Sequence, residues 1–148
     1  MELPYLSRNV AVLLAFLLLP AGVHAAERHA GAATARTRVV VQVSDNDEQK
    51  WKLALNNVKN MQQDLGMENV DIEVVAYGPG INMLKAGSPV GKRVSQAVES
   101  GVKIAACQNT MKAQKLGKSD MLPGIGYVRA GVVEIIRKQN EGYAYLRP

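Results

Sequence analysis

The sequence has few of the side chains on which most catalytic sites depend, because its 148 residues include one cysteine and two histidines. Both histidines, His24 and His29, precede the region that we expect to fold. They leave that region without a histidine base or metal ligand, which argues against a Cys–His protease and a histidine-dependent metal centre. Cys107 has no second cysteine for a disulfide within the chain, so its thiol must be buried, reactive or paired between chains.

Aromatic residues and blocks of charge are also scarce. One Trp, one Phe and five Tyr accompany a net charge of +5, and the lysines and arginines are scattered among acids. Proteins that bind nucleic acids usually gather basic residues on one face and add aromatic side chains on which bases stack. We therefore expect no nucleic-acid partner.

A long apolar run occurs only near the N-terminus, over residues 10–19. Arg8 precedes this run, and Pro20 and a small-residue ending at Ala25 follow it, which is typical of a cleaved secretory signal. The run is shorter than a membrane-spanning helix, and no second one follows. We expect residues 1–25 to be removed, the mature protein to be periplasmic or secreted, and no membrane insertion after cleavage.

The remaining chain suits a single domain. Residues 26–37 are rich in alanine, glycine and charge without a consistent period, so we expect a flexible lead-in. Over residues 38–148, β-branched runs alternate with segments whose apolar residues recur every three or four positions. This pattern predicts an α/β fold, a three-layer sandwich in which a mainly parallel sheet of about five strands has helices on both faces.

The expected strands lie near residues 39–43, 70–77, 102–106, 127–129 and 143–146. The expected helices cover residues 48–65, 90–100 and 108–116, and a fourth helix ends at Gly142. In this fourth helix the residues that share one face, as the apolar side of an amphipathic helix does, are Val132, Ile135, Ile136 and Gln139.

Cys107 stands where the apolar run 102–106 gives way to a polar stretch that starts a helix. In a parallel sheet this places the thiol at the carboxyl edge, where open α/β sheets bind their ligands. Amide groups at the helix start favour a thiolate there. Asn109 and Thr110 can hydrogen-bond nearby groups or simply cap the helix. The alternative is that Cys107 is a small apolar core residue.

Other site chemistries fit the sequence poorly. The turn over residues 44–48 carries acids where a phosphate-binding loop needs glycines, and Gly78–Pro79–Gly80 is more typical of a turn. Asp45 and Asp47 occupy typical solvated or capping positions. We expect neither a metal nor a cofactor.

The loop from residue 78 to 89 can roof a pocket, which suggests a different kind of function. The residues that we expect to line a pocket or a subunit contact are Tyr77, Gly78, Ile81, Met83, Leu84 and Tyr127. The alternative to thiol chemistry is therefore a noncatalytic, oligomeric binding module.

Four segments carry a family resemblance: Val43-Ser44-Asp45-Asn46-Asp47, Val75-Ala76-Tyr77-Gly78-Pro79-Gly80, Ala106-Cys107-Gln108-Asn109-Thr110-Met111 and Met121-Leu122-Pro123-Gly124-Ile125-Gly126. Together with residues 131–134 and the closing residues 142–148, they resemble the DsrE/DsrF-like family. The resemblance implies a compact α/β sandwich that forms homo-oligomers, trimers or hexamers. It also implies that Cys107 matches the position at which some members carry sulfur as a persulfide.

Persulfide transfer needs a nucleophilic thiolate and access to a sulfur donor or acceptor protein, but neither a metal nor a histidine. Familiar sulfur-relay members work in the cytoplasm with companion subunits, whereas the signal pattern of this chain predicts export. The expected function is an exported sulfur carrier or sulfurtransferase that accepts sulfane sulfur on Cys107. The binding module is retained as the alternative.

Overall fold

The computed structural model of this chain describes residues 36–148. The predicted signal, residues 1–25, and nearly all of the predicted lead-in lie outside the described residues. The first strand begins at Thr37, whose backbone N–H donates to the carbonyl of Asn69 at 2.8 Å.

Five parallel strands form one sheet in the order β4-β3-β2-β1-β5. Their bounds are β1 Thr37–Val43, β2 Val70–Ala76, β3 Lys103–Cys107, β4 Gly126–Val128 and β5 Ala144–Leu146. Strand β2 is almost wholly buried, and β1 is buried at Val39, Val40, Val41 and Val43, as expected for strands that helices cover on both faces. The predicted α/β architecture is confirmed.

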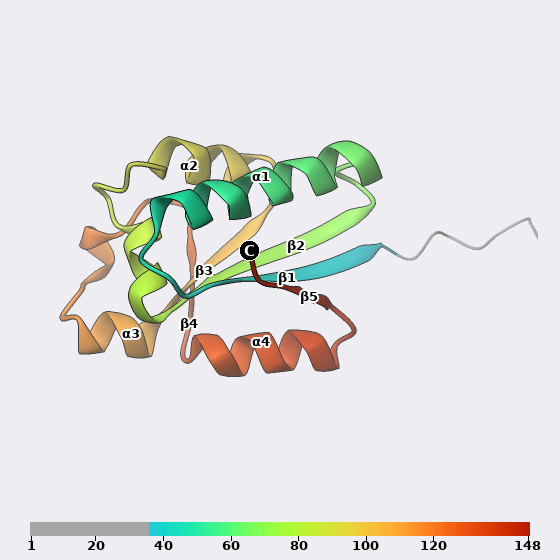
Figure 1. Cartoon of the computed structure of the whole chain (residues 1–148). Helices are drawn as coiled ribbons and strands as arrows, with labels where there is room; N and C mark the ends of the chain where they lie inside the picture. Colours follow the sequence, from blue (N-terminus) through green and yellow to red (C-terminus); the bar gives the residue numbers. More distant parts are fainter. Residues whose placement is uncertain (1–35) are drawn as a thin grey trace, which may run out of the picture. The chain divides into compact units, whose positions relative to one another are not determined.

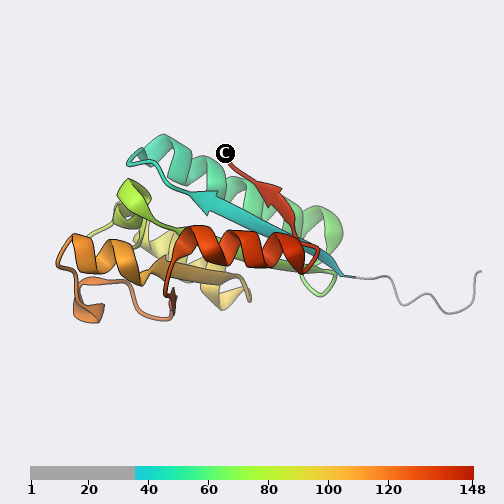
Figure 2. The same ribbon diagram turned by 90° about the horizontal axis from the view of Figure 1, so that it is seen from below.

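Helices α1 (Glu48–Leu65) and α2 (Gly91–Glu99) cover one face of the sheet, and α4 (Gly131–Asn140) covers the other (Figures 1 and 2). Connections from β1 to β3 run in one direction across the sheet, so right-handed crossovers put α1 and α2 on the same side. The connection through α4 runs back from β4 to β5, the two edge strands. It therefore lies on the opposite face.

Three short helical segments lie at the carboxyl ends of the strands (Figure 1). They are the 3-10 helix η1 (Gly78–Leu84), helix α3 (Gln108–Ala113) and the 3-10 helix η2 (Lys118–Asp120). Segment η1 reaches the sheet closely, because a Cβ on Gly80 would lie 2.3 Å from the carbonyl oxygen of Val43. Glycine at this position lets the loop pack onto the end of β1.

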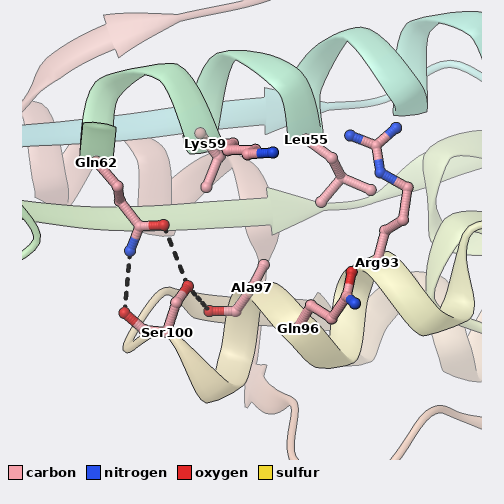
Figure 3. Close-up of a pocket in the computed structure, with 8 residues that line it drawn as sticks. Leu55, Lys59, Gln62, Arg93, Gln96, Ala97 and Ser100 are labelled. Carbon is pink, nitrogen blue, oxygen red and sulfur yellow. Dashed lines mark hydrogen bonds between the residues drawn. The ribbon is translucent and has the colours of Figure 1, made fainter. Parts of the chain in front are cut away.

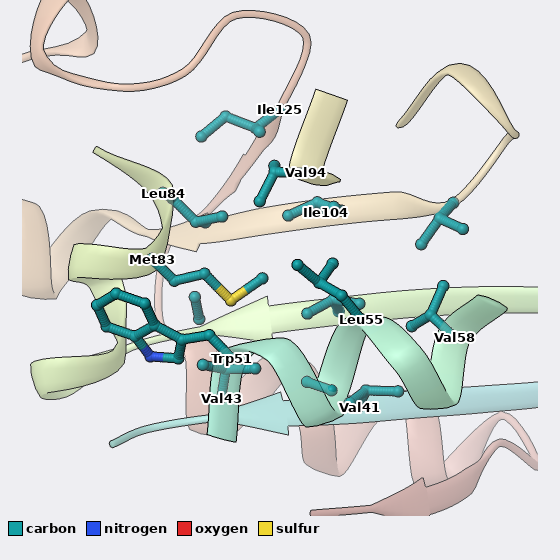
Figure 4. Close-up of a cluster of buried hydrophobic side chains, with 14 of the residues drawn as sticks. Val41, Val43, Trp51, Leu55, Val58, Met83, Leu84, Val94, Ile104 and Ile125 are labelled. Carbon is teal, nitrogen blue, oxygen red and sulfur yellow. The ribbon is translucent and has the colours of Figure 1, made fainter. Parts of the chain in front are cut away.

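The main core fills the space between the sheet and helices α1 and α2 (Figure 4). Trp51, Leu55 and Val58 supply its α1 side, as their helical spacing predicts. Ile81, Met83 and Leu84 of η1 belong to the same core and are 0% exposed. These three residues therefore cannot reach a ligand or a second subunit unless the core opens, contrary to the surface role that we expected for them.

The face of α4 that is buried differs from the prediction. Val132 and Ile136 are each 53% exposed, while Ile135 and Lys138 are buried. The reason lies in the sheet beneath, where β2 presents Glu73 to α4 and Lys138 pairs with it at 3.0 Å. An interior carboxylate needs a cationic partner, so α4 buries its lysine in place of two of its apolar residues.

Candidate functional site

Cys107 ends β3 and immediately precedes the first residue of α3. Ile104 and Ala106 face the main core, so the alternation of the strand turns Cys107 toward α4. There its Sγ accepts a hydrogen bond from the backbone N–H of Gly131, the first residue of α4, at 3.2 Å. The starts of two helices thus meet at one sulfur atom, at the sheet edge where the sequence predicts the site.

The close approach of α4 to the sulfur depends on a glycine. A Cβ on Gly131 would lie 2.9 Å from the Cβ of Tyr77, a distance that real Cβ atoms do not tolerate. A second tie fixes the two helix starts, because the N–H of Asn109 donates to the carbonyl of Arg129 at 3.1 Å. Local packing therefore holds the Gly131 amide in place before any ligand arrives.

The structure distinguishes between the two roles, hydrogen bonding to nearby groups or helix capping, that the sequence allows for Asn109 and Thr110. The hydroxyl oxygen of Thr110 accepts a hydrogen bond from the N–H of Gly78 at 2.9 Å, which joins α3 to η1. No side chain caps the start of α3, so neither residue serves as its N-cap. Asn109 is exposed, and its backbone N–H makes the contact with Arg129.

The electrostatic surroundings favour the thiolate of Cys107. Burial by itself raises the pKa of the thiol, but hydrogen bonding by the Thr110 side chain and the Gly131 amide, followed by the amides of Thr110 and Asn109, outweighs burial. The pKa of the Cys107 thiol is consequently lowered from its ordinary value. The positive ends of the α3 and α4 dipoles act in the same direction.

The sulfur of Cys107 is buried, and the groups around it are polar. Cys107 is 5% exposed, so little of the residue is accessible to a reagent. A cysteine that acts only as an apolar core residue would face hydrocarbon, whereas this one faces backbone amides and a hydroxyl. The arrangement can stabilise the Cys107 thiolate, which can then attack a small electrophile.

The other predicted site residues lie in different parts of the structure. Gly78 adopts a φ of +54° beside Thr110, and half-buried Tyr77 packs in the small cluster beneath α4. Half-buried Tyr127 borders a separate cavity of about 390 Å³ against α3, where the ammonium of Lys118 lies 4.9 Å from its ring centre. Together with the burial of the η1 residues, this means that the predicted pocket residues do not form one cleft.

Two structural features are not apparent from the local sequence pattern. The sequence marks Gly131 only as part of a family segment and as a glycine that opens an amphipathic helix. The buried pair of Glu73 and Lys138 could have been suspected from a glutamate within an otherwise apolar strand.

Over residues 36–148 no three His, Cys, Asp or Glu side chains come together as metal ligands. None of the helices formed by these residues has the length and apolar character that crossing a membrane requires.

The DsrE/DsrF-like family model matches residues 37–148. A solved protein of unknown function, MTH1491 from Methanobacterium thermoautotrophicum, is 42% identical with a TM-score of 0.72, covering 76% of this chain and 99% of that one. Bacteroides thetaiotaomicron BT1422, also of unknown function, is 14% identical with a TM-score of 0.65, covering 80% and 100%. The Escherichia coli ychN protein is 12% identical with a TM-score of 0.61, covering 76% and 99%. The last two show the fold alone, and no curated protein matches.

Proposed function

Because this chain belongs to the DsrE/DsrF-like family, which is associated with sulfur relay, we propose that it carries sulfane sulfur as a persulfide on Cys107. The single observation that carries the proposal is the 3.2 Å hydrogen bond from the Gly131 amide to Sγ. It supports a stabilised thiolate at the strand end. A merely structural cysteine has no need of such a donor.

The transfer step needs only a thiolate and a donor of sulfane sulfur. The Cys107 thiolate attacks the outer sulfur of a donor persulfide or polysulfide, a new S–S bond forms on Cys107, and the S–S bond of the donor breaks. The donor leaves as a thiolate that keeps the bonding electron pair. Delivery repeats the step in reverse on an acceptor thiolate, so no metal and no net oxidant is required.

The low exposure of Cys107 bears on what loads it. With 5% of the residue exposed, inorganic polysulfide or another small donor reaches the thiolate more easily than a cysteine on a folded protein. The carried sulfur then stands one S–S bond, about 2 Å, beyond Sγ. A donor or acceptor protein would have to bring its own reactive sulfur to this small exposed part of Cys107.

Intact-mass measurement after incubation with polysulfide tests this function. The expected result is the gain of one sulfur atom, removed by a thiol reductant and absent from Cys107→Ser. Unmodified protein after prolonged incubation, with the thiol shown to be reduced at the start, would contradict the carrier role.

Export is part of the same proposal. It is supported by the arginine, apolar run and small-residue ending in residues 1–25, which lie outside the described residues. Expression of the full chain in a bacterium followed by fractionation tests it. The expected result is a periplasmic or secreted protein that begins at Ala26, and an uncleaved cytoplasmic protein would contradict it.

Homo-oligomer formation, as a trimer or hexamer, completes the proposal. Its support is the apolar stripe of α4, formed by Val132, Val133 and Ile136, which are 53%, 59% and 53% exposed. A stripe of this kind on a helix surface is typical of a protein interface. Light scattering should show the assembly, Val133→Lys should weaken it, and Gln63→Lys, at an exposed position of α1 on the other face of the sheet, should leave it intact. A wild-type monomer at all concentrations would contradict the proposal.

The noncatalytic binding module remains the second candidate, and the burial of Cys107 favours it. On that account Cys107→Ser changes neither assembly nor ligand binding, and the wild-type protein gains no sulfur from polysulfide. If the protein is a sulfur carrier, the wild type instead gains one sulfur atom from polysulfide.

A further inference from the structure

A groove with a different chemistry lies between α1 and α2, on the face of the sheet opposite α4 (Figure 3). Its volume is about 340 Å³, within the range of small-molecule sites. The sulfur relay on Cys107 uses none of its residues. The groove is therefore a separate feature of the molecule.

The floor of the groove is apolar and its rim is cationic. Ala97 supplies aliphatic surface from α2, and the core residues Leu55 and Val58, which are 4% and 1% exposed, close the floor beneath it. Lys59 and Arg93 project into the groove from α1 and α2, with Leu55 lying between them in the view of Figure 3. A ligand that satisfies both parts needs a hydrocarbon body and a negative charge.

The two cations lack acidic partners. Over residues 36–148 neither Lys59 nor Arg93 takes part in an ion pair, and no Asp or Glu lines the groove. The Arg93 guanidinium donates to the neutral amide oxygen of Asn56 at 2.7 Å, which directs it while leaving its charge uncompensated. Two uncompensated cations beside one apolar floor attract an anion more strongly than isolated surface lysines do.

One end of the groove is closed by a fixed polar contact. The Gln62 side chain donates to the Ser100 carbonyl at 3.0 Å (Figure 3). The Ser100 hydroxyl lies 2.8 Å from the Ala97 carbonyl and 3.1 Å from the Gln62 amide oxygen, the two acceptors for its one proton. These contacts connect the C-terminal parts of α1 and α2. The groove walls are consequently held at a set spacing, so a ligand finds the site already formed.

We propose that this groove binds a small amphiphilic anion, a carboxylate on a short hydrocarbon chain. The carboxylate pairs with Arg93 and Lys59, since a guanidinium fork matches carboxylate geometry. The chain lies over Ala97, with the buried Leu55 and Val58 closing the floor beneath it. The site is independent of Cys107 and serves as a second binding function of the domain.

Isothermal titration calorimetry with octanoate as the probe tests the proposal. Octanoate should bind one site per chain, and Arg93→Gln should weaken binding about tenfold, the usual effect of losing a charge-assisted hydrogen bond. Lys92→Gln is the matched control, because it removes the same charge from α2 outside the groove and should leave binding unchanged. Equal weakening by both variants, or no binding to the wild type, would overturn the proposal.

Two further measurements separate the parts of the ligand. Ala97→Met fills the floor without changing charge and should weaken octanoate binding while the circular dichroism of the protein is preserved. Acetate should bind much more weakly than octanoate, since it lacks the chain. Acetate binding as tight as octanoate binding, or full retention in Ala97→Met, would overturn the amphiphile assignment. Retention of octanoate binding in Cys107→Ser distinguishes this site from the sulfur-relay proposal.

Discussion

The backbone amide of Gly131 donates a hydrogen bond to the Sγ of Cys107, joining the start of α4 to the end of β3 across 24 residues of chain. The bond makes the reactivity of the thiol depend on the placement of a helix that packs on the far side of the sheet from the main core. Substitutions that move the start of α4 should therefore change the pKa and reactivity of the Cys107 thiol, even where they make no contact with the sulfur.

Gly131→Ala is the most direct change of this kind. Its new Cβ would meet the Cβ of Tyr77 at 2.9 Å, so the start of α4 must shift away from the sulfur. We expect a higher Cys107 pKa, slower alkylation at neutral pH and a loss of about 1–3 kcal/mol of stability, as in other overpacked sites. Iodoacetamide kinetics and urea unfolding measure the two effects. Gly87→Ala, where nothing lies within 4 Å, is the control and should change neither.

Thr110→Val removes a hydroxyl that serves two neighbours. The Gly78 N–H loses its acceptor, at a cost of about 1–3 kcal/mol, and the thiolate loses a donor that lowers its pKa. The pH midpoint of Cys107 alkylation should rise. Thr110→Ser keeps the hydroxyl and should restore most of the wild-type midpoint. A midpoint in Thr110→Val that stays at the wild-type value would show that the hydroxyl does not act on the sulfur.

Lys138→Met should destabilise the fold strongly. It leaves the Glu73 carboxylate buried without its 3.0 Å partner, a change that typically costs about 3–5 kcal/mol. Burial already raises the pKa of Glu73, and Lys138 opposes the rise. Without Lys138, the Glu73 carboxyl should therefore bind its proton at a higher pH than in the wild type. The double variant Glu73→Gln with Lys138→Met should recover much of the stability in urea unfolding. A double variant no more stable than Lys138→Met would contradict this account.

Asp71 should contribute to the acid sensitivity of the fold. Burial alone raises its pKa, but hydrogen bonds from Tyr143 at 2.6 Å and Lys103 at 3.0 Å outweigh burial and lower it from 3.8. A carboxyl whose pKa is depressed by folding stabilises the protein above its unfolded pKa and loses that contribution as the pH falls through the folded value.

Asp71→Asn should therefore cost about 1 kcal/mol at neutral pH and lose less stability than the wild type as the pH falls below 3.8. Asp64→Asn is the control, because Asp64 is exposed on α1 and makes no ion pair within residues 36–148. Urea unfolding at several pH values measures both variants. Parallel acid profiles for Asp71→Asn and the wild type would show that Asp71 has no such role.

Much of this fold follows from local pattern. The bounds of α1 could be predicted because Asp47 caps its start, Gly66 ends it at a φ of +86°, and its apolar spacing is regular. The place of Cys107 at the carboxyl edge of the sheet could be predicted because the apolar run 102–106 meets a helix start. Both are decided by residues adjacent in the sequence.

The features that could not be predicted depend on contacts between distant segments. Which side of α4 is buried was decided by Glu73, on a strand far away in the sequence. The burial of Met83 and its neighbours depends on η1 folding back over the ends of the strands, made feasible by the close contact of Gly80 with β1. The role of Gly131 likewise rests on its distance to Tyr77. Periodicity along one segment contains none of this information.

The central claim, that the fold stabilises the Cys107 thiolate, is tested most directly by ultraviolet titration of thiolate absorbance, taken as the difference between the wild type and Cys107→Ser. This measurement reports ionisation without requiring a reagent to reach the buried sulfur. The account predicts a single thiol titration with a midpoint below that of an unperturbed cysteine, about 8.5, and a higher midpoint in Gly131→Ala. A wild-type midpoint at or above that of an unperturbed cysteine would contradict it.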